Sequence, residues 1–471
     1  MKAGVKGWIT REVAWPEAPA GVVAGLAGRF DELVWLDSSD ASPGGGLNPP
    51  AGGRWSLVAW APRAVVVQQS GNAELSVFGR RPVRGDSIWR LLRESYGANF
   101  VREPCGLGLT PGWIGFAGFA AAGLLERVAC RAGPDEVIAR FGLFEQGVVL
   151  DHGARRAFAV GVVGDEATET LDSVVSAWSE ACAGGFTPPP VAAVLREMVP
   201  RAGFESAVRR AREYIAAGDI YQVNLAHRIG LEFAGDPLGA YVRLREGNPA
   251  AYGAFLRWED RAIASVSPEL FLEVRDGRVR TSPIKGTRPL SGEAARDDAV
   301  IGELLGSSKD AAELAMIVDL HRNDVGRVCR PGGVRVTNAR RIERIPGVVH
   351  TVADIEGELA SGRDGLDALM ACFPAGSISG VPKIRAIDII AELETTPRGA
   401  YTGAIGVLGL DGTASFSVAI RTLQLSAGRA ELHVGGGIVA DSEPAAEYEE
   451  TLTKARRILA ALGVEFGAGT G

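Results

Sequence analysis

Cysteine, long apolar runs and clustered positive charge are all scarce in this sequence of 471 residues. The five cysteines are an odd number without a Cys-x-x-Cys pair, so neither a disulfide framework nor a zinc site is indicated. No apolar run is long enough to span a bilayer or resembles a leader, so we expect a cytoplasmic protein that does not bind membranes. The net charge of −7 argues against nucleic-acid binding, which requires concentrated positive charge.

Lysine is also rare, with six lysines against 44 arginines. Such a sequence uses arginine wherever a general positive charge suffices, so each internal lysine becomes a candidate for chemistry that arginine cannot perform. We interpret Lys309 and Lys383 as helix-terminus or surface charges. Lys285 and Lys454 each lie in a segment with other candidate site residues.

The order of predicted elements indicates an α+β fold. Residues 1–183 alternate short β-like runs with turns rich in glycine and proline. Residues 184–202 are predicted to be a linker, because three consecutive prolines fit neither a helix nor a central strand. Residues 203–465 combine amphipathic helices with strands, including one predicted over 415–424. Strands and helices do not alternate regularly, so an antiparallel sheet is favoured over a doubly wound parallel one.

A glycine triplet, Gly435–Gly437, precedes a helix predicted over 444–462. Backbone N–H groups near a helix start can hold an anion. On this helix Glu447, Glu450 and Lys454 share one face because of their helical spacing. The stripe is typical of a solvated salt-bridge ladder, and it can equally supply two carboxylates and an ammonium to a site.

Two further acids lie at predicted element boundaries. Glu313 is near the start of a helix predicted over 310–322, where a carboxylate either satisfies the helix dipole or points inward. With Glu450 it would supply oxygen ligands for Mg²⁺ from two helices. Glu269 precedes a β-like run, where desolvation would raise the pKa of its carboxyl group and suit it to general acid catalysis. A surface turn is the alternative for Glu269.

These segments together resemble the chorismate-utilising enzymes, which include anthranilate synthase component I, aminodeoxychorismate synthase component I, and the isochorismate and salicylate synthases. The resemblance is continuous over about residues 200–465. Its motifs, in chain order, are Gly218–Leu225, Ser267–Leu270, Pro283–Arg288, Glu313–Val328, Phe373–Lys383, Gly403–Gly406, Ala419–Thr422 and Gly435–Lys454. The resemblance implies a two-sheet β-sandwich surrounded by helices, with Mg²⁺ and chorismate in a cleft.

The resemblance also implies a role for each matching residue. Glu313 and Glu450 match the magnesium ligands, with Glu447 acting through water. Glu269 matches the general acid that protonates the departing 4-hydroxyl of chorismate. Thr287 and His350 match positions beside the reacting ring, and His350 is counted among the catalytic residues. The positions that match contacts to the enolpyruvyl carboxylate are Tyr401, Arg421, Gly436, Gly437 and Lys454.

Two positions separate the reactions within the family. Gln222 stands where isochorismate-forming relatives have a lysine that activates water, and an amide cannot act as that base. Lys285 stands where anthranilate synthases have alanine. It matches the members in which a lysine attacks C2 of chorismate before ammonia enters at C4. The resemblance therefore implies 4-amino-4-deoxychorismate as the product, for 4-aminobenzoate and folate synthesis.

Two alternatives remain. An anthranilate synthase would share nearly every site residue, and Lys285 argues against it. A non-catalytic regulatory or scaffold homologue would lack the acid or the metal ligands, yet Glu269, Glu313 and Glu450 are all present.

The source of ammonia and a second ligand are further expectations from the resemblance. No cysteine lies in a Gly-x-Cys-x-Gly elbow, so the sequence lacks glutaminase chemistry and a glutamine amidotransferase subunit is the implied partner. Relatives bind tryptophan around a Leu-Glu-Ser segment. Here the segment is Leu36–Ser39, followed by an insert rich in glycine and proline, so Leu36 and Ser38 are candidate tryptophan contacts.

Overall fold

A computed structural model describes residues 7–39, 51–134, 136–163, 167–345 and 347–465, and most of the predicted insert at 40–53 lies outside them. The fold consists of two 12-stranded sheets. Sheet A contains β1 (Trp8–Val13), β2 (Leu33–Asp37), β3 (Trp55–Trp60), β9 (Gln146–Asp151), β10 (Arg156–Val162), β11 (Val191–Met198), β12 (Gln222–Gly235), β13 (Tyr252–Trp258), β14 (Arg261–Ser267), β20 (Gly380–Val381), β23 (Thr422–Ser426) and β24 (Arg429–Ile438). Sheet B contains β4 (Ala64–Gln69), β5 (Asn72–Val77), β6 (Val83–Gly85), β7 (Gly112–Ala117), β8 (Ala139–Leu143), β15 (Leu270–Arg275), β16 (Arg278–Ser282), β17 (Ile284–Pro289), β18 (Arg335–Ile345), β19 (Val348–Glu358), β21 (Ala404–Gly409) and β22 (Ala414–Val418).

Neighbouring strands in both sheets are antiparallel. The order in sheet A is β1-β10-β9-β3-β2-β13-β14-β23-β24-β12-β11, with β20 beside β12. The order in sheet B is β17-β19-β16-β15-β22-β21-β7-β8-β4-β5-β6, with β18 beside β19. The helices are α1 (Pro19–Ala27), α2 (Ile88–Asn99), α3 (Ala167–Cys182), α4 (Arg201–Ala216), α5 (Pro237–Gly247), α6 (Ala294–Gly306), α7 (Ser308–Gly326), α8 (Gly365–Cys372), α9 (Lys383–Leu393) and α10 (Pro444–Ala461), with short 3₁₀ turns η1 (Ala51–Arg54), η2 (Phe119–Leu124) and η3 (Gly376–Ile378).

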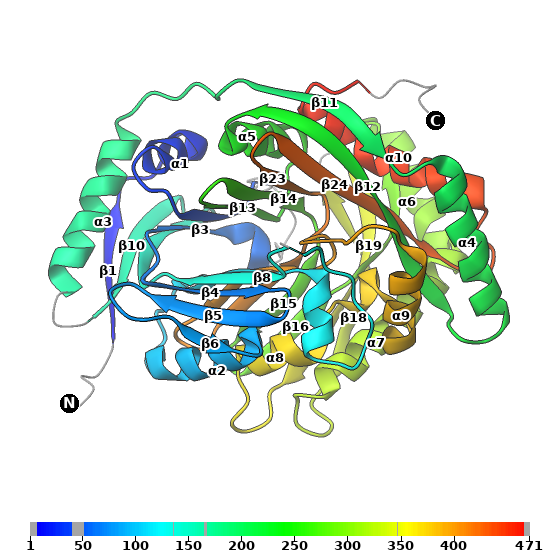
Figure 1. The fold of residues 1–471 in the computed structure, drawn as a ribbon, viewed down its shortest axis with the longest axis horizontal. Coiled ribbons are helices and arrows are strands. Elements are labelled where there is room, and N and C mark those ends of the chain that lie inside the picture. Colours follow the sequence, from blue (N-terminus) through cyan, green and yellow to red (C-terminus); the bar gives the residue numbers. More distant parts are fainter. Residues whose placement is uncertain (1–6, 40–50, 135, 164–166, 346, 466–471) are drawn as a thin grey trace.

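The two sheets pack face to face and helices cover their outer faces (Figure 1). Within β2, Val34 packs between the sheets, whereas Trp35 packs under α1, α3 and α5. Both faces of such a strand are buried, so Leu33–Leu36 are all apolar and do not alternate with polar residues. The helices α2 and α8 contribute to the core on the outer side of sheet B, whereas α9 packs against β12 and β20 of sheet A. The predicted α+β sandwich surrounded by helices is confirmed.

Both sheets contain strands from either side of the interval 184–202. Strand β2 pairs with β13 in sheet A, and β7 pairs with β21 in sheet B. The predicted N-terminal and catalytic regions therefore share both sheets, and their division into domains stays a prediction. The interval itself contains the edge strand β11, and α4 begins at Arg201. The three prolines lie just before β11, where a missing N–H does not interrupt the sheet.

The chain passes between the sheets several times, and two of these crossings lie next to each other. At the first it passes from A to B between β14 and β15, and at the second from B to A between β22 and β23. The Ser267 hydroxyl donates to the Val418 carbonyl at 2.6 Å, and the Val418 N–H donates to the Glu269 carbonyl at 3.1 Å. The single strand predicted over 415–424 is therefore wrong, because Arg421 adopts a left-handed φ of 50° that ends one strand before the next begins.

The described helices include none with both the length and the apolar character needed to cross a bilayer.

Candidate active site

Glu269 lies at the first of the two sheet crossings. Its side chain is buried, and the Ser377 hydroxyl donates a hydrogen bond to Oε1. Burial raises the pKa of Glu269 to about 7, although the Ser377 hydrogen bond and the charge of Lys285 act in the opposite direction. A carboxyl group with this pKa retains its proton in many molecules at neutral pH, as a general acid must.

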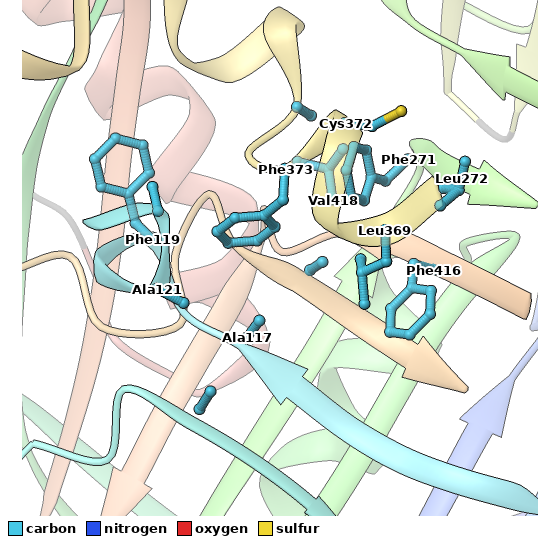
Figure 2. Packing of buried hydrophobic residues seen from close by; sticks show 14 of the residues in the cluster. Ala117, Phe119, Ala121, Phe271, Leu272, Leu369, Cys372, Phe373, Phe416 and Val418 are labelled. Carbon is cyan, nitrogen blue, oxygen red and sulfur yellow. The ribbon is translucent and has the colours of Figure 1, made fainter. Parts of the chain in front are cut away.

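Aromatic packing holds Glu269 and Ser377 together. Phe271 closely follows Glu269, and Phe373 closely precedes Ser377. The two phenyl rings meet edge to face with 6.4 Å between their centroids (Figure 2). The sequence motif Phe373–Lys383 predicts no role for Ser377, because no spacing pattern marks a serine whose contact lies more than 100 positions away.

Lys285 lies in β17, beside a β-bulge. The register with β19 shifts between Lys285 and Thr287, so Gly286 is the extra residue. Its φ of 72° is in the left-handed region, and a Cβ atom there would approach Cδ1 of Leu304 to 2.9 Å. Both conformation and space therefore require glycine. A bulge bends its strand and changes the direction of nearby side chains, and this one lies next to the candidate nucleophile.

The Lys285 side chain faces the glycine triplet of β24. A Cβ atom added at Gly437 would lie 3.3 Å from its Nζ atom. Desolvation lowers the pKa of Lys285, while the charges of Glu313 and Glu269 oppose this shift. Among the described residues, no carboxylate lies within ion-pair distance of Lys285. The lowered pKa increases the fraction of neutral amine, which is the form that acts as a nucleophile.

The other internal lysines behave differently. Lys309 is exposed in the first turn of α7, as expected for a helix-terminus charge. Lys383 begins α9, but it is buried, pairs with Asp324 at 2.6 Å and donates to the Cys372 carbonyl at 2.8 Å. Lys383 is therefore a helix-terminus charge, which is one of the two predictions, but it is not a surface charge, because a partner on α7 compensates its burial.

Gln222 is fully buried at the start of β12. Neither its side-chain oxygen nor its side-chain nitrogen has a hydrogen-bond partner among the described residues. Buried amides without partners are rare in proteins, and each missing hydrogen bond is costly. A Cβ atom at Gly437 would lie only 2.8 Å from Nε2 of Gln222. The amide therefore faces the same space as Lys285, where a ligand can satisfy it.

This close approach yields a prediction for Gly437. In Gly437→Ala the new methyl group displaces the Gln222 amide and narrows the space beside Lys285. We expect the KM for chorismate to rise about tenfold or more, equivalent to about 1.4 kcal/mol of lost binding. Steady-state kinetics on chorismate consumption will test this. Gly302→Ala on α6 is the matched control, because its Cβ would meet nothing within 4 Å and its KM should not change.

His350 and Thr287 lie on neighbouring strands and contact each other. Their Nδ1 and Oγ1 atoms are 2.7 Å apart, and Nε2 of the buried histidine has no partner among the described residues. Burial and the nearby charge of Arg421 lower the pKa of His350 to about 4. The imidazole is therefore neutral at pH 7, and its second nitrogen is available to a ligand. Thr287 itself is exposed.

Three candidate contacts for a substrate carboxylate have different surroundings. Arg421 has no acidic partner among the described side chains, and desolvation lowers its pKa. Tyr401 is buried, stacks on His433 with 5.6 Å between ring centroids, and keeps its proton because burial raises its pKa to about 12. Lys454 pairs with Glu450 at 2.8 Å and donates to the Gly435 carbonyl at 2.9 Å. An unpaired guanidinium is well suited to bind a carboxylate at two points.

Glu447, Glu450 and Lys454 share one face of α10, as predicted. A Cβ atom added at Gly436 would lie 3.2 Å from Oε2 of Glu447 and 3.9 Å from Nζ of Lys454. Oε1 of Glu447 accepts a hydrogen bond from Ser442 at 2.6 Å. Desolvation raises the pKa of Glu447, whereas the Lys454 charge lowers that of Glu450. The helix therefore turns the Glu447 carboxylate and the Lys454 ammonium toward the glycine triplet.

The donor chemistry of this region fits Mg²⁺. Within the described ranges, no three His, Cys, Asp or Glu side chains form a ready metal cluster. Mg²⁺ does not need one, because it commonly binds through one or two carboxylates and completes its coordination with water and substrate oxygens. Glu313 on α7 and Glu450 on α10 both raise the pKa of Lys285 through their charge, so both carboxylates lie in its neighbourhood.

Leu36 and Ser38 line a different cavity, between the two sheets. Its open space measures about 40 Å³, and it shares no lining residue with the group around Lys285. The Ser38 hydroxyl already donates to the carbonyls of Trp55 and Ala251, at 2.8 and 3.0 Å. The cavity is too small for an indole without rearrangement, so the tryptophan site stays a prediction.

A family model described as "chorismate binding enzyme" matches residues 47–460. The chain belongs to this family. Chorismate-binding enzymes similar to it include anthranilate synthase component 1 of Streptomyces coelicolor, 39% identical over 83% of this chain and 81% of that protein. Another is aminodeoxychorismate synthase component 1 of Klebsiella aerogenes, 38% identical over 74% of this chain and 76% of that protein.

A solved structure agrees with this assignment. The crystal structure of anthranilate synthase component I from Streptococcus pneumoniae matches with a TM-score of 0.74 and 31% identity, over 88% of this chain and 93% of that one. The protein is thus a chorismate-utilising enzyme with the anthranilate synthase component I fold. The similar proteins include both anthranilate synthases and an aminodeoxychorismate synthase, so similarity alone does not decide which reaction this protein catalyses.

Proposed function

We propose that this protein acts as aminodeoxychorismate synthase component I, converting chorismate and ammonia to 4-amino-4-deoxychorismate. One observation carries the proposal: Lys285 faces Gly437 and Gln222, its pKa is lowered by burial, and no described carboxylate pairs with it. Glu269, whose charge acts on Lys285, has a pKa near 7 and supplies the proton. A nucleophile and an acid thus border one space.

The reaction follows in two displacements. The neutral amine of Lys285 bonds to C2 of chorismate, the two ring double bonds shift, and the C4–O bond breaks. Glu269 gives its proton to the departing hydroxyl, which leaves as water. Ammonia then bonds to C4, the double bonds shift back, and the C2–N bond to Lys285 breaks. Chorismate and ammonia give 4-amino-4-deoxychorismate and water, and the enolpyruvyl group stays in place.

The remaining residues bind and orient the substrate. Arg421 binds the enolpyruvyl carboxylate, with Lys454 adding positive charge. His350 is a neutral imidazole and lies beside the ring. Mg²⁺ held by Glu313 and Glu450, with Glu447 acting through water, would neutralise the ring carboxylate when bound.

Ammonia requires a source outside the described chain. A glutamine amidotransferase subunit is the proposed partner, and ammonium salts replace it in vitro. The product then serves 4-aminobenzoate synthesis for folate.

Anthranilate synthase component I is the second candidate, because relatives of that name align over most of the chain. It would release pyruvate and form an aromatic, fluorescent product. Lys285 distinguishes the two candidates, since an anthranilate-forming site needs no covalent attachment to the enzyme.

A coupled assay tests the proposal. Chorismate, Mg²⁺ and ammonia are incubated with the protein, and aminodeoxychorismate lyase is then added. We expect 4-aminobenzoate to form only after the lyase is present. Anthranilate fluorescence before the lyase is added would overturn the proposal in favour of the second candidate.

The tryptophan site predicts a change in thermal stability. A ligand that binds only the native state raises the melting temperature, by an amount set by its concentration relative to Kd. If the cavity beside Leu36 opens for tryptophan, we expect 1 mM tryptophan to raise Tm by about 2 °C or more. Differential scanning fluorimetry with tryptophan and with phenylalanine as the control will measure it. Equal Tm values with and without tryptophan would show that the cavity does not bind it.

A further inference from the structure

Arg398 is deeply buried on the loop that joins α9 to β21. Its side chain is 2% exposed and forms two parallel hydrogen bonds to Glu394, from Nε at 2.9 Å and from Nη2 at 2.6 Å. Glu394 also accepts the N–H of Ala226 at 2.8 Å, and the ring of Phe119 lies 4.4 Å from the guanidinium carbon. A buried ion pair is weak evidence for stability, and here it indicates a fixed geometry.

Every N–H group of the Arg398 guanidinium has an acceptor. After the two bonds to Glu394, Nη2 donates to the Asn224 carbonyl at 2.7 Å. Nη1 donates to the Thr402 hydroxyl at 2.9 Å and to the Ile378 carbonyl at 3.4 Å. One planar group therefore connects three segments: the start of β12, the end of η3, and its own loop before β21. Only arginine offers five donors in one plane.

Each of these segments carries a residue assigned to the site. Asn224 follows Gln222 on β12, Ile378 directly follows Ser377, and Thr402 directly follows Tyr401. We propose that Arg398 is a positioning residue that fixes Gln222, Ser377 and Tyr401 relative to one another. Arg398 acts through these three residues. The inference rests on their proposed assignment to the substrate and general-acid site.

The backbone around Tyr401 supports this role. Thr402 has a left-handed φ of 59°, which a residue with a side chain adopts only at a cost in free energy. The Thr402 hydroxyl donates to the Tyr401 carbonyl at 2.6 Å while it accepts from Arg398. Arg398 thus holds Thr402 in place, and the conformation of Thr402 sets the direction of the Tyr401 backbone.

Arg398→Lys tests the inference, because lysine keeps the charge but has three donors and cannot hold all three segments. We expect the KM for chorismate to rise at least tenfold and kcat to fall at least tenfold. Chorismate consumption is the readout, so the result does not depend on which product forms. Arg140→Lys is the matched control: Arg140 pairs with Glu32 at 2.7 Å and lies 5.2 Å from the Trp258 ring, away from the site. It should lower Tm without changing KM or kcat.

A double-mutant cycle distinguishes positioning from general destabilisation. Arg398→Lys and Tyr401→Phe are measured singly and together. If Arg398 acts through Tyr401, the combined loss of kcat/KM will be smaller than the product of the single losses. The inference would be overturned if the loss of kcat/KM in the double variant equals the product of the two single losses. It would also be overturned if the kinetics of Arg398→Lys match those of Arg140→Lys. If Arg398→Lys does not fold, Glu394→Gln takes its place in the same cycle, and the same two outcomes decide.

The proposed function and this inference fail separately. An unexpected product from the wild-type enzyme would reject the reaction but leave the effect of Arg398 on chorismate use. Wild-type formation of 4-amino-4-deoxychorismate with unchanged kinetics in Arg398→Lys would reject only the inference.

Discussion

Replacement of Lys285 with alanine is expected to lower the rate of 4-amino-4-deoxychorismate formation roughly 10³-fold or more, because removing a nucleophile removes a whole step of the reaction. Chorismate binding should change far less, since the contacts assigned to Arg421 and Lys454 remain. Lys285→Arg is the informative control. It keeps a positive charge in the same place but cannot act as a nucleophile near neutral pH. The lyase-coupled assay measures both variants.

The two variants separate a covalent role for Lys285 from an electrostatic one. If Lys285 only stabilises the substrate through its charge, Lys285→Arg will keep most of the activity that Lys285→Ala loses. If Lys285 forms a bond to C2, both variants will be equally inactive. Mass spectrometry of enzyme incubated with chorismate and quenched without ammonia should show a substrate adduct on Lys285, and its absence from that sample would count against the covalent step.

Glu269→Gln is expected to lower kcat about 10²–10⁴-fold, the usual contribution of a general acid. Glutamine keeps the size of the side chain but has no transferable proton. The wild-type enzyme should lose activity as pH rises through about 7, because the active form of Glu269 is the protonated one. In Glu269→Gln this decline should be absent. A pH profile of kcat for both enzymes will check the assignment.

Stability provides an independent check on Glu269. Its folded pKa of about 7 is above the ordinary value of 4.5, so the folded state holds the proton more tightly than the unfolded state. This group therefore makes stability fall as pH rises from about 4.5 to 7, and it leaves a buried charge above that range. Glu269→Gln should thus be at least as stable as wild type at pH 8. A markedly lower Tm would show that the kinetic loss reflects unfolding.

Local patterns predicted much of the fold and part of the site. Helical spacing alone placed Glu447, Glu450 and Lys454 on one face, and the structure confirms this. The irregular order of strands and helices predicted the antiparallel α+β class. These features depend on contacts within one element or between neighbours in sequence, which periodicity reports directly.

Features that depend on distant contacts could not be predicted. Arg421 lies where the chain changes sheets, and no pattern within 415–424 marks that crossing. The burial of Lys383 depends on Asp324 on another helix. Ser377 acquires its role only through contact with Glu269. In each case the partner decides the role, and the partner is known only from the tertiary structure.

The identity of the first product is the most direct test of the proposed function. The wild-type protein is incubated with chorismate, Mg²⁺ and ammonia, with no second enzyme present, and the mixture is analysed by mass spectrometry and by an enzymatic assay for pyruvate. We expect a product that has lost one hydroxyl and gained one amine, retains the enolpyruvyl group, and appears without pyruvate. Stoichiometric release of pyruvate together with anthranilate would contradict it.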